Sequence, residues 1–134
     1  MNPTVKAIPD GFHSANVYLQ VENAEKQIAF LKKAFSAEEV HRSVGPDGSI
    51  MHAQVRLGDS VIMVGQAGEP WKPRPCTVYL YVDDVDAAHR SAVEAGAKSL
   101  AEPKDQFYGD RSGGVKDAFG NQWYIATHIK DMAS

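Results

Sequence analysis

The chain has 134 residues, of which 43% are hydrophobic and 23% charged, and these values are typical of a globular rather than a disordered protein. Its net charge is −3 at pH 7, and its lysines and arginines are scattered among acidic residues, so a nucleic-acid partner is not expected. Cys76 is the only cysteine, which excludes an internal disulfide and favours a reducing compartment.

The first predicted strand, over residues 17–21, has a second copy later in the chain. Val17-Tyr18-Leu19-Gln20-Val21 recurs as Val78-Tyr79-Leu80-Tyr81-Val82, at an offset of 61 residues (78 minus 17). In each copy the strand is followed by a residue that favours a helix N-cap, Asn23 or Asp84. The recurrence therefore predicts two modules of one kind, each beginning with a strand and a helix.

Apolar residues recur at helical spacing after each cap and predict helices over 24–35 and from 85 to Gly96, where the glycine ends the helix. The residues expected to face inward are Ala24, Ile28, Leu31, Phe35, Val85, Ala88 and Ala92. His89 lies on the second helix next to Arg90, and we expect its side chain to be in solvent.

Three short extended segments follow each predicted helix, with turn residues between most of them. In the first module they lie at about 38–44, 50–57 and 60–64, and in the second at about 98–102, 111–116 and 122–128. Residues 65–75 contain three prolines and two glycines and are interpreted as a connector.

These elements predict an α+β protein with one domain over residues 1–134. It consists of two βαβββ modules, at about 12–64 and 76–128, related by a pseudo-twofold axis and joined by the connector at 65–75. Pairing the two mixed sheets covers their edges, so we expect them to form a half-barrel that encloses a cup.

Strand alternation predicts which side chains face the cup, because successive residues point to opposite faces of a sheet. Aliphatic residues such as Leu19 and Leu80 belong under the helices, which leaves tyrosines and polar residues opposite. With two residues of the loop at 106–112, the predicted ligand-binding set is Asn16, Tyr18, His52, Gln54, Met63, Thr77, Tyr79, Tyr81, Tyr108, Arg111 and Tyr124.

Two of these interpretations have a structural alternative. The tyrosines could merely fill the space between the two sheets rather than contact a ligand. Arg111 could clamp a carboxylate or phosphate with two hydrogen bonds, or it could join Asp110 in tying the glycine-rich hairpin together. No nucleophile–base pattern and no phosphate-binding or dinucleotide-binding motif is present in the sequence, so the catalytic residues, if any, remain unassigned.

Several segments give the chain a family resemblance: Val21-Glu22-Asn23, Ala29-Phe30-Leu31, Gly58-Asp59, Val82-Asp83-Asp84-Val85-Asp86 and Asp117-Ala118-Phe119-Gly120-Asn121. With them the chain resembles the vicinal-oxygen-chelate superfamily of glyoxalases, bleomycin-resistance proteins and extradiol dioxygenases. Residues 105–113 and 125–128 look like an uncharacterised glyoxalase-like branch similar to phosphonate-operon PhnB-type proteins.

The resemblance implies a divalent metal held at four positions, which here are Asn16, Met63, Thr77 and Tyr124. None of the four is a histidine or an acid, and an amide, a thioether, a hydroxyl and a phenol are poor ligands for such an ion. We therefore expect no metal and no cofactor, and we favour a protein that is not an enzyme.

The leading functional hypothesis is a cytoplasmic, metal-independent protein that binds an aromatic or amphipathic small molecule and forms a homodimer. Trp71, in the connector, could then cover the cup or a neighbouring subunit. One alternative is a metal-dependent glyoxalase-like lyase, isomerase or dioxygenase with atypical ligands such as His52 and His128. Another is an interaction module whose cup is filled by its own side chains. No leader or membrane-spanning segment is expected from the sequence.

Overall fold

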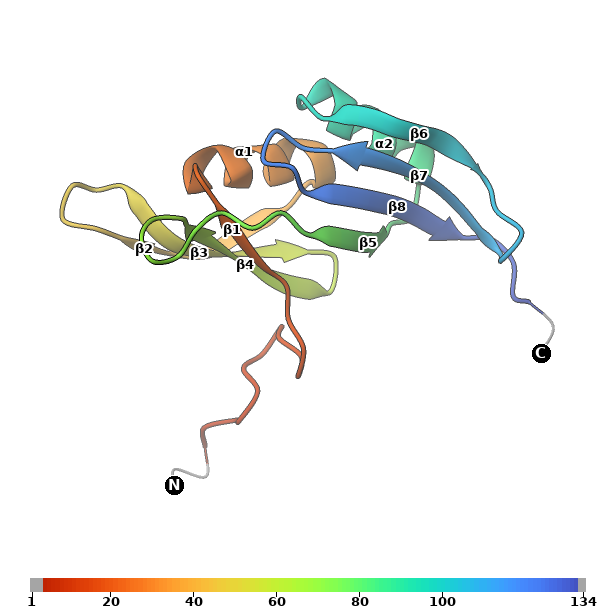
Figure 1. Ribbon diagram of the computed structural model, residues 1–134. Helices are drawn as coiled ribbons and strands as arrows, with labels where there is room; N and C mark the ends of the chain where they lie inside the picture. Colours follow the sequence, from red (N-terminus) through yellow and green to blue (C-terminus); the bar gives the residue numbers. More distant parts are fainter. Residues whose placement is uncertain (1–3, 133–134) are drawn as a thin grey trace.

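Two four-stranded mixed sheets and two helices build the fold in the computed structural model, which describes residues 4–132 (Figure 1). The first module contains β1 (Tyr18–Val21), α1 (Ala24–Phe35), β2 (Glu38–Val44), β3 (Ile50–Leu57) and β4 (Ser60–Gln66). The second contains β5 (Thr77–Tyr81), α2 (Val85–Glu94), β6 (Lys98–Asp105), β7 (Asp110–Lys116) and β8 (Gln122–His128).

The two sheets have the same topology, with strand orders β1-β4-β3-β2 and β5-β8-β7-β6. In each sheet the first and last strands of the module pair in parallel, whereas the other neighbours are antiparallel. The predicted α+β class with two βαβββ modules is thus confirmed. Figure 1 shows the sheets next to each other, with α1 and α2 packed together on one side of them.

Both helices begin at the predicted caps. The Asn23 side chain accepts a hydrogen bond from the Lys26 N–H (3.0 Å), and the Asp84 side chain accepts one from the Ala87 N–H (3.1 Å). After α2 the chain turns at Gly96, whose φ of +111° favours a residue without a Cβ atom. Within residues 4–132, no helix has the length and apolar character needed to cross a membrane.

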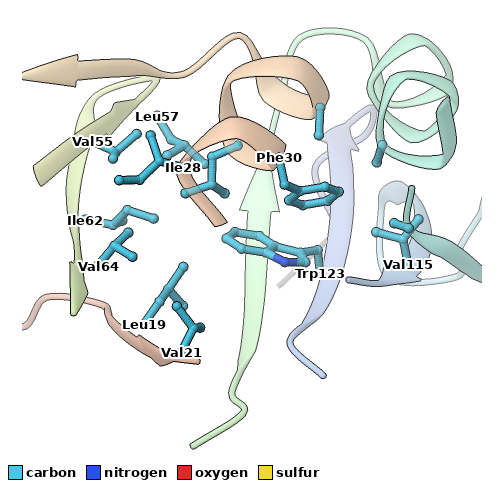
Figure 2. Close-up of a cluster of buried hydrophobic side chains, with 14 of the residues drawn as sticks. Leu19, Val21, Ile28, Phe30, Val55, Leu57, Ile62, Val64, Val115 and Trp123 are labelled. Carbon is cyan, nitrogen blue, oxygen red and sulfur yellow. The ribbon is translucent and has the colours of Figure 1, made fainter. Parts of the chain in front are cut away.

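The hydrophobic core lies between the helices and the sheets (Figure 2). It includes Leu19, Ile28, Val55 and Val64 of the first module and Trp123 of the second, so one core is shared by both modules. The Phe35 and Trp123 rings lie 5.2 Å apart and join α1 to β8. Phe35 itself is only partly buried, whereas Phe30, which the helical pattern did not place inward, is buried in the core.

A buried group of polar side chains, which we name the polar hub, also joins the modules. It consists of Gln27 of α1, Asp117 and Asn121 of the β7–β8 turn, and Trp123. Asp117 Oδ2 accepts hydrogen bonds from Gln27 Nε2 (3.2 Å), Asn121 Nδ2 (3.2 Å) and Trp123 Nε1 (3.0 Å). Its Oδ1 accepts from the backbone N–H groups of Phe119 (2.9 Å) and Asn121 (3.0 Å). The five donors compensate the buried carboxylate.

The connector is more structured than its composition indicates. Its first two residues continue β4, and Arg74 forms a β-bridge with Gln20, so the connector covers the outer edge of β1. A second bridge between Gly68 and Trp71 closes a tight loop. The expectation of a solvated His89 was wrong: its side chain is buried between α2 and β6, and its Nε2 lies 3.1 Å from the Ser99 hydroxyl.

Candidate functional site

Each sheet packs one face against the helices and leaves the other open, and the predicted ligand-binding residues divide between the two open faces. Tyr18, His52, Gln54 and Met63 lie on the open face of the first sheet, where Met63 is the register partner of both Tyr18 and Gln54. We call this surface the first face. Thr77, Tyr79, Tyr81 and Tyr124 lie on the corresponding surface of the second sheet, the second face.

The first face carries a cavity of about 390 Å³ next to β4. Asn16, Gln54 and Met63 line it together with residues of the N-terminal segment, among them Ile8 and Phe12. The backbone N–H of Val61 donates to the Gly11 carbonyl (3.1 Å), which fixes this segment against the sheet. The contribution of residues 7–14 was not predicted, because a short segment without periodicity gives no signal of where it packs.

A second cavity on the first face, of about 460 Å³, lies along β1 and β4. Its lining includes Tyr18, Gln20, Met51 and Trp71, so the connector brings the tryptophan next to the tyrosine. The Trp71 side chain remains 68% exposed. Tyr18 also meets His52, with its hydroxyl 3.5 Å from His52 Nδ1.

On both faces a tyrosine ring lies over a glycine. A Cβ atom on Gly65 would come within 2.3 Å of the Tyr18 hydroxyl oxygen, and one on Gly114 would lie 3.0 Å from the Tyr124 ring. The two glycines therefore leave the space that each ring occupies against the sheet. Exposed tyrosine rings on an open sheet face suit an aromatic ligand.

The second face holds a compact polar cluster around Asp110 of β7, whose side chain is buried. Asp110 Oδ2 accepts hydrogen bonds from the hydroxyls of Tyr79 (2.6 Å) and Tyr81 (2.9 Å). Asp110 Oδ1 lies 2.8 Å from Nδ1 of His128, and His128 Nε2 lies 2.7 Å from Asp131.

The contacts within this cluster shift the pKa values of Asp110, His128 and Tyr79. The hydrogen bonds from Tyr79 and then from His128 lower the pKa of Asp110, so it is ionised at neutral pH. The hydrogen bond to Asp110, followed by the one to Asp131, raises the pKa of His128 above its usual value. Burial and the hydrogen bond to Asp110 raise the pKa of Tyr79, which keeps its phenol neutral.

The remaining two predicted residues lie near this cluster but differ in what they contact. The Tyr108 hydroxyl is 3.4 Å from the Ser112 hydroxyl, beside the second face. Arg111 alternates with Asp110 along β7, and its guanidinium binds both carboxylate oxygens of Asp86 at 2.9 Å and Asp105 at 3.1 Å. These contacts direct Arg111 toward α2 and β6, whereas the structural alternative had paired it with Asp110.

Asp110 and His128 were not predicted as partners. They are opposite each other in the antiparallel β7–β8 register, so the pairing is visible only once that register is known. From the sequence we considered Asp110 only as part of a hairpin tie with Arg111, and His128 only as a candidate metal ligand, because Asp110 and His128 are 18 positions apart.

The raised pKa of His128 makes a testable contribution to stability. A group whose pKa is raised on folding stabilises the protein below its unfolded-state pKa of 6.5, and this contribution disappears as pH rises through the folded-state pKa. We expect His128→Gln to destabilise the protein most below that pH and least in alkaline solution. Urea denaturation between about pH 5 and about pH 9 measures the difference. His41→Gln is the control, because this histidine is also exposed but its ring lies near an uncharged group, the Ser43 hydroxyl, instead of a carboxylate. A destabilisation by His128→Gln that does not change with pH would contradict the assignment.

The four positions at which a metal is implied do not fit a divalent ion. Asn16 and Met63 line a cavity of the first face, and the Asn16 amide is bonded to the backbone of His13. Tyr124 lies on the second face, and its hydroxyl donates to Gln122 (3.1 Å). Within residues 4–132, no three histidine, cysteine or acidic side chains are grouped so that they could hold a metal ion. His52 and His128 lie on different faces.

Comparison with known proteins places this geometry in a family. Residues 12–125 match the model of the glyoxalase/bleomycin resistance protein/dioxygenase superfamily. An uncharacterised protein of Mycobacterium bovis is 35% identical over 126 residues, which cover 86% of this chain and 83% of the relative.

Solved structures have the same fold at lower sequence identity. TioX from Micromonospora sp. ML1 superposes with a TM-score of 0.72 at 23% identity, covering 87% of this chain and 100% of TioX. A PhnB protein from Bacillus cereus superposes with a TM-score of 0.66 at 16% identity, covering 86% and 99%. Sequence and fold agree: the chain belongs to the glyoxalase/bleomycin resistance protein/dioxygenase superfamily.

Proposed function

We propose that this protein binds an aromatic or amphipathic small molecule on its open sheet faces without a metal ion. The observation that carries the proposal is the set of tyrosine rings on these faces, two of which lie close against glycines. Apolar and aromatic walls with a few directional polar groups are typical of small-molecule sites. The family's metal positions carry donors that bind divalent ions poorly, which favours binding over metal-assisted turnover.

We propose further that a homodimer completes the cup. The two cavities of the first face are lined by residues of the first module, the N-terminal segment and the connector, so neither contains a residue of the second face. Tyr18, Tyr79 and Tyr81 are 48%, 44% and 61% exposed. A second copy related by a twofold axis would place the second face of one chain over the first face of the other. Exposed aromatic patches of this kind commonly mark surfaces that bind another protein chain or a ligand.

The binding proposal is tested by fluorescence titration of the purified protein with a library of aromatic compounds. For each compound that binds, Tyr79→Ala and Tyr124→Ala should weaken the affinity about three- to tenfold, because each removes one stacking ring. Phe107→Ala is the control, since this 88% exposed ring lies at the tip of the β6–β7 hairpin. Unchanged affinity in both tyrosine variants would overturn the site, and a monomer by light scattering would overturn the dimer.

Mass spectrometry of the native protein separates binding from the metal-dependent alternative. The proposal predicts a copurified organic molecule and no stoichiometric metal. A stoichiometric divalent metal that is lost in His52→Ala would favour a glyoxalase-like lyase, isomerase or dioxygenase instead. His52 is the histidine to test because it lies on the first face against Tyr18.

A further inference from the structure

His128 is held in one orientation by a buried partner. Asp110 is only 3% exposed, and three groups surround its carboxylate: the Tyr79 and Tyr81 hydroxyls and His128 Nδ1. Because both oxygens of Asp110 are engaged, this carboxylate has no further role toward a ligand. Its effect is to fix the imidazole ring of His128 at the edge of the second face.

The opposite nitrogen of His128 faces a group that is easily replaced. His128 Nε2 lies 2.7 Å from Asp131, whose side chain is 97% exposed, and the His128 side chain itself is 48% exposed. Asp131 lies three residues after His128, beyond the end of β8. An exposed ion pair of this kind contributes little stability, so another carboxylate can compete for the same nitrogen.

A carboxylate at each ring nitrogen requires both nitrogens to donate, and the ring is then an imidazolium cation. The hydrogen bond that His128 donates to the buried Asp110 is the larger cause of the raised pKa of His128. The Asp110 contact does not depend on Asp131, so it still favours the charged ring when Asp131 moves away. Lys104, opposite Ser112 in the β6–β7 register, adds a second cation on the same side of the sheet.

We propose that His128 binds the anionic group of an organic acid, and that Asp131 occupies this position when no ligand is present. The ligand's carboxylate or phosphate would replace the Asp131 carboxylate at Nε2, while its apolar part lies on the neighbouring ring of Tyr81, which is 61% exposed. The inference rests on the proposed small-molecule function and narrows its ligand to an amphipathic anion.

Nuclear magnetic resonance of the full chain tests the site, with benzoate as the probe and the His128 ring nitrogens as the reporter. We expect benzoate to shift the Nε2 signal, and Asp131→Asn to bind benzoate about two- to sixfold more tightly than the wild type, because the competing carboxylate is gone. Benzamide, which has the same shape without the charge, should not shift the signal. His128→Gln should lose benzoate binding, whereas Asp59→Asn, at an exposed turn of the first module, should behave as the wild type.

The outcomes separate this proposal from the broader one. Equal benzoate affinity in the wild type and Asp131→Asn, or benzamide binding as tight as that of benzoate, would overturn the anion site. If compounds bind with an affinity that depends on Tyr79 but leave the His128 signal unchanged, the anion site is also overturned. The proposed small-molecule function would then remain intact. A benzoate shift at His128, combined with unchanged affinities in the tyrosine variants, would support the anion site and overturn the aromatic cup.

Discussion

Asp117→Ala is expected to lower the free energy of unfolding by more than about 3 kcal/mol. Five donors point at the Asp117 carboxylate, from the Gln27 and Trp123 side chains, the Asn121 side chain and backbone, and the Phe119 backbone. Alanine would remove this acceptor from all five, and only Asn121 Nδ2 would keep another, Gln27 Oε1 at 3.0 Å. Each unpaired buried donor costs about 1–3 kcal/mol, although water entering the space would recover part of the sum. Urea denaturation followed by tryptophan fluorescence measures the change.

The control for this prediction is Asp59→Ala, at the corresponding β3–β4 turn of the first module. Asp59 is exposed and its side chain accepts a hydrogen bond from the Ser60 hydroxyl (3.1 Å), so we expect a change within about 0.5 kcal/mol. Similar destabilisation by the two alanine variants would mean that the polar hub adds no more than an ordinary turn.

Gly109→Ala is expected to detach the segment that follows β8. Gly109 has a φ of +97°, and a Cβ atom there would lie 2.1 Å from the backbone carbonyl oxygen of Lys130. The N–H groups of Ile129 and Lys130 both donate to the Gly109 carbonyl, at 2.9 and 3.1 Å. A clash with backbone cannot be relieved by rotating a side chain, so these two hydrogen bonds should break and the position of Asp131 should change.

Hydrogen exchange at the amides of Ile129 and Lys130 measures this detachment. Gly48→Ala is the matched control, because Gly48 also has a positive φ, +82°, but has open space where the Cβ would be. In both variants backbone strain should lower the free energy of unfolding by about 1–2 kcal/mol. Only Gly109→Ala should accelerate hydrogen exchange in the C-terminal segment. Protected amides in Gly109→Ala would show that the segment is held by other contacts.

The elements and the composition of the two faces were predictable because they depend on local periodicity. The repeat of residues 17–21 at 78–82, the caps at Asn23 and Asp84, and strand alternation place the tyrosines opposite the helices, as the structure has them. These patterns can be recognised within each module, without knowing how the two modules contact each other.

The features that were missed depend on contacts between segments far apart in the chain. Gln27 is a polar residue of α1 whose side chain is buried. Its hydrogen-bond partner is Asp117, which lies ninety positions later in the chain. His89 is buried because β6 packs against α2. Asp110 and His128 become partners through strand register, and the N-terminal segment lines a cavity through one backbone contact at Gly11.

The polar hub makes the two copies of the repeat mutually dependent. If the chain were divided within the connector, the first half would retain Gln27 without its acceptor, and the second half would lose one of the donors to Asp117 together with the ring of Phe35 that packs on Trp123. A duplicated unit that once folded alone would have needed neither contact. We therefore expect that this gene cannot be halved into two working proteins, although each half encodes a complete sheet and helix.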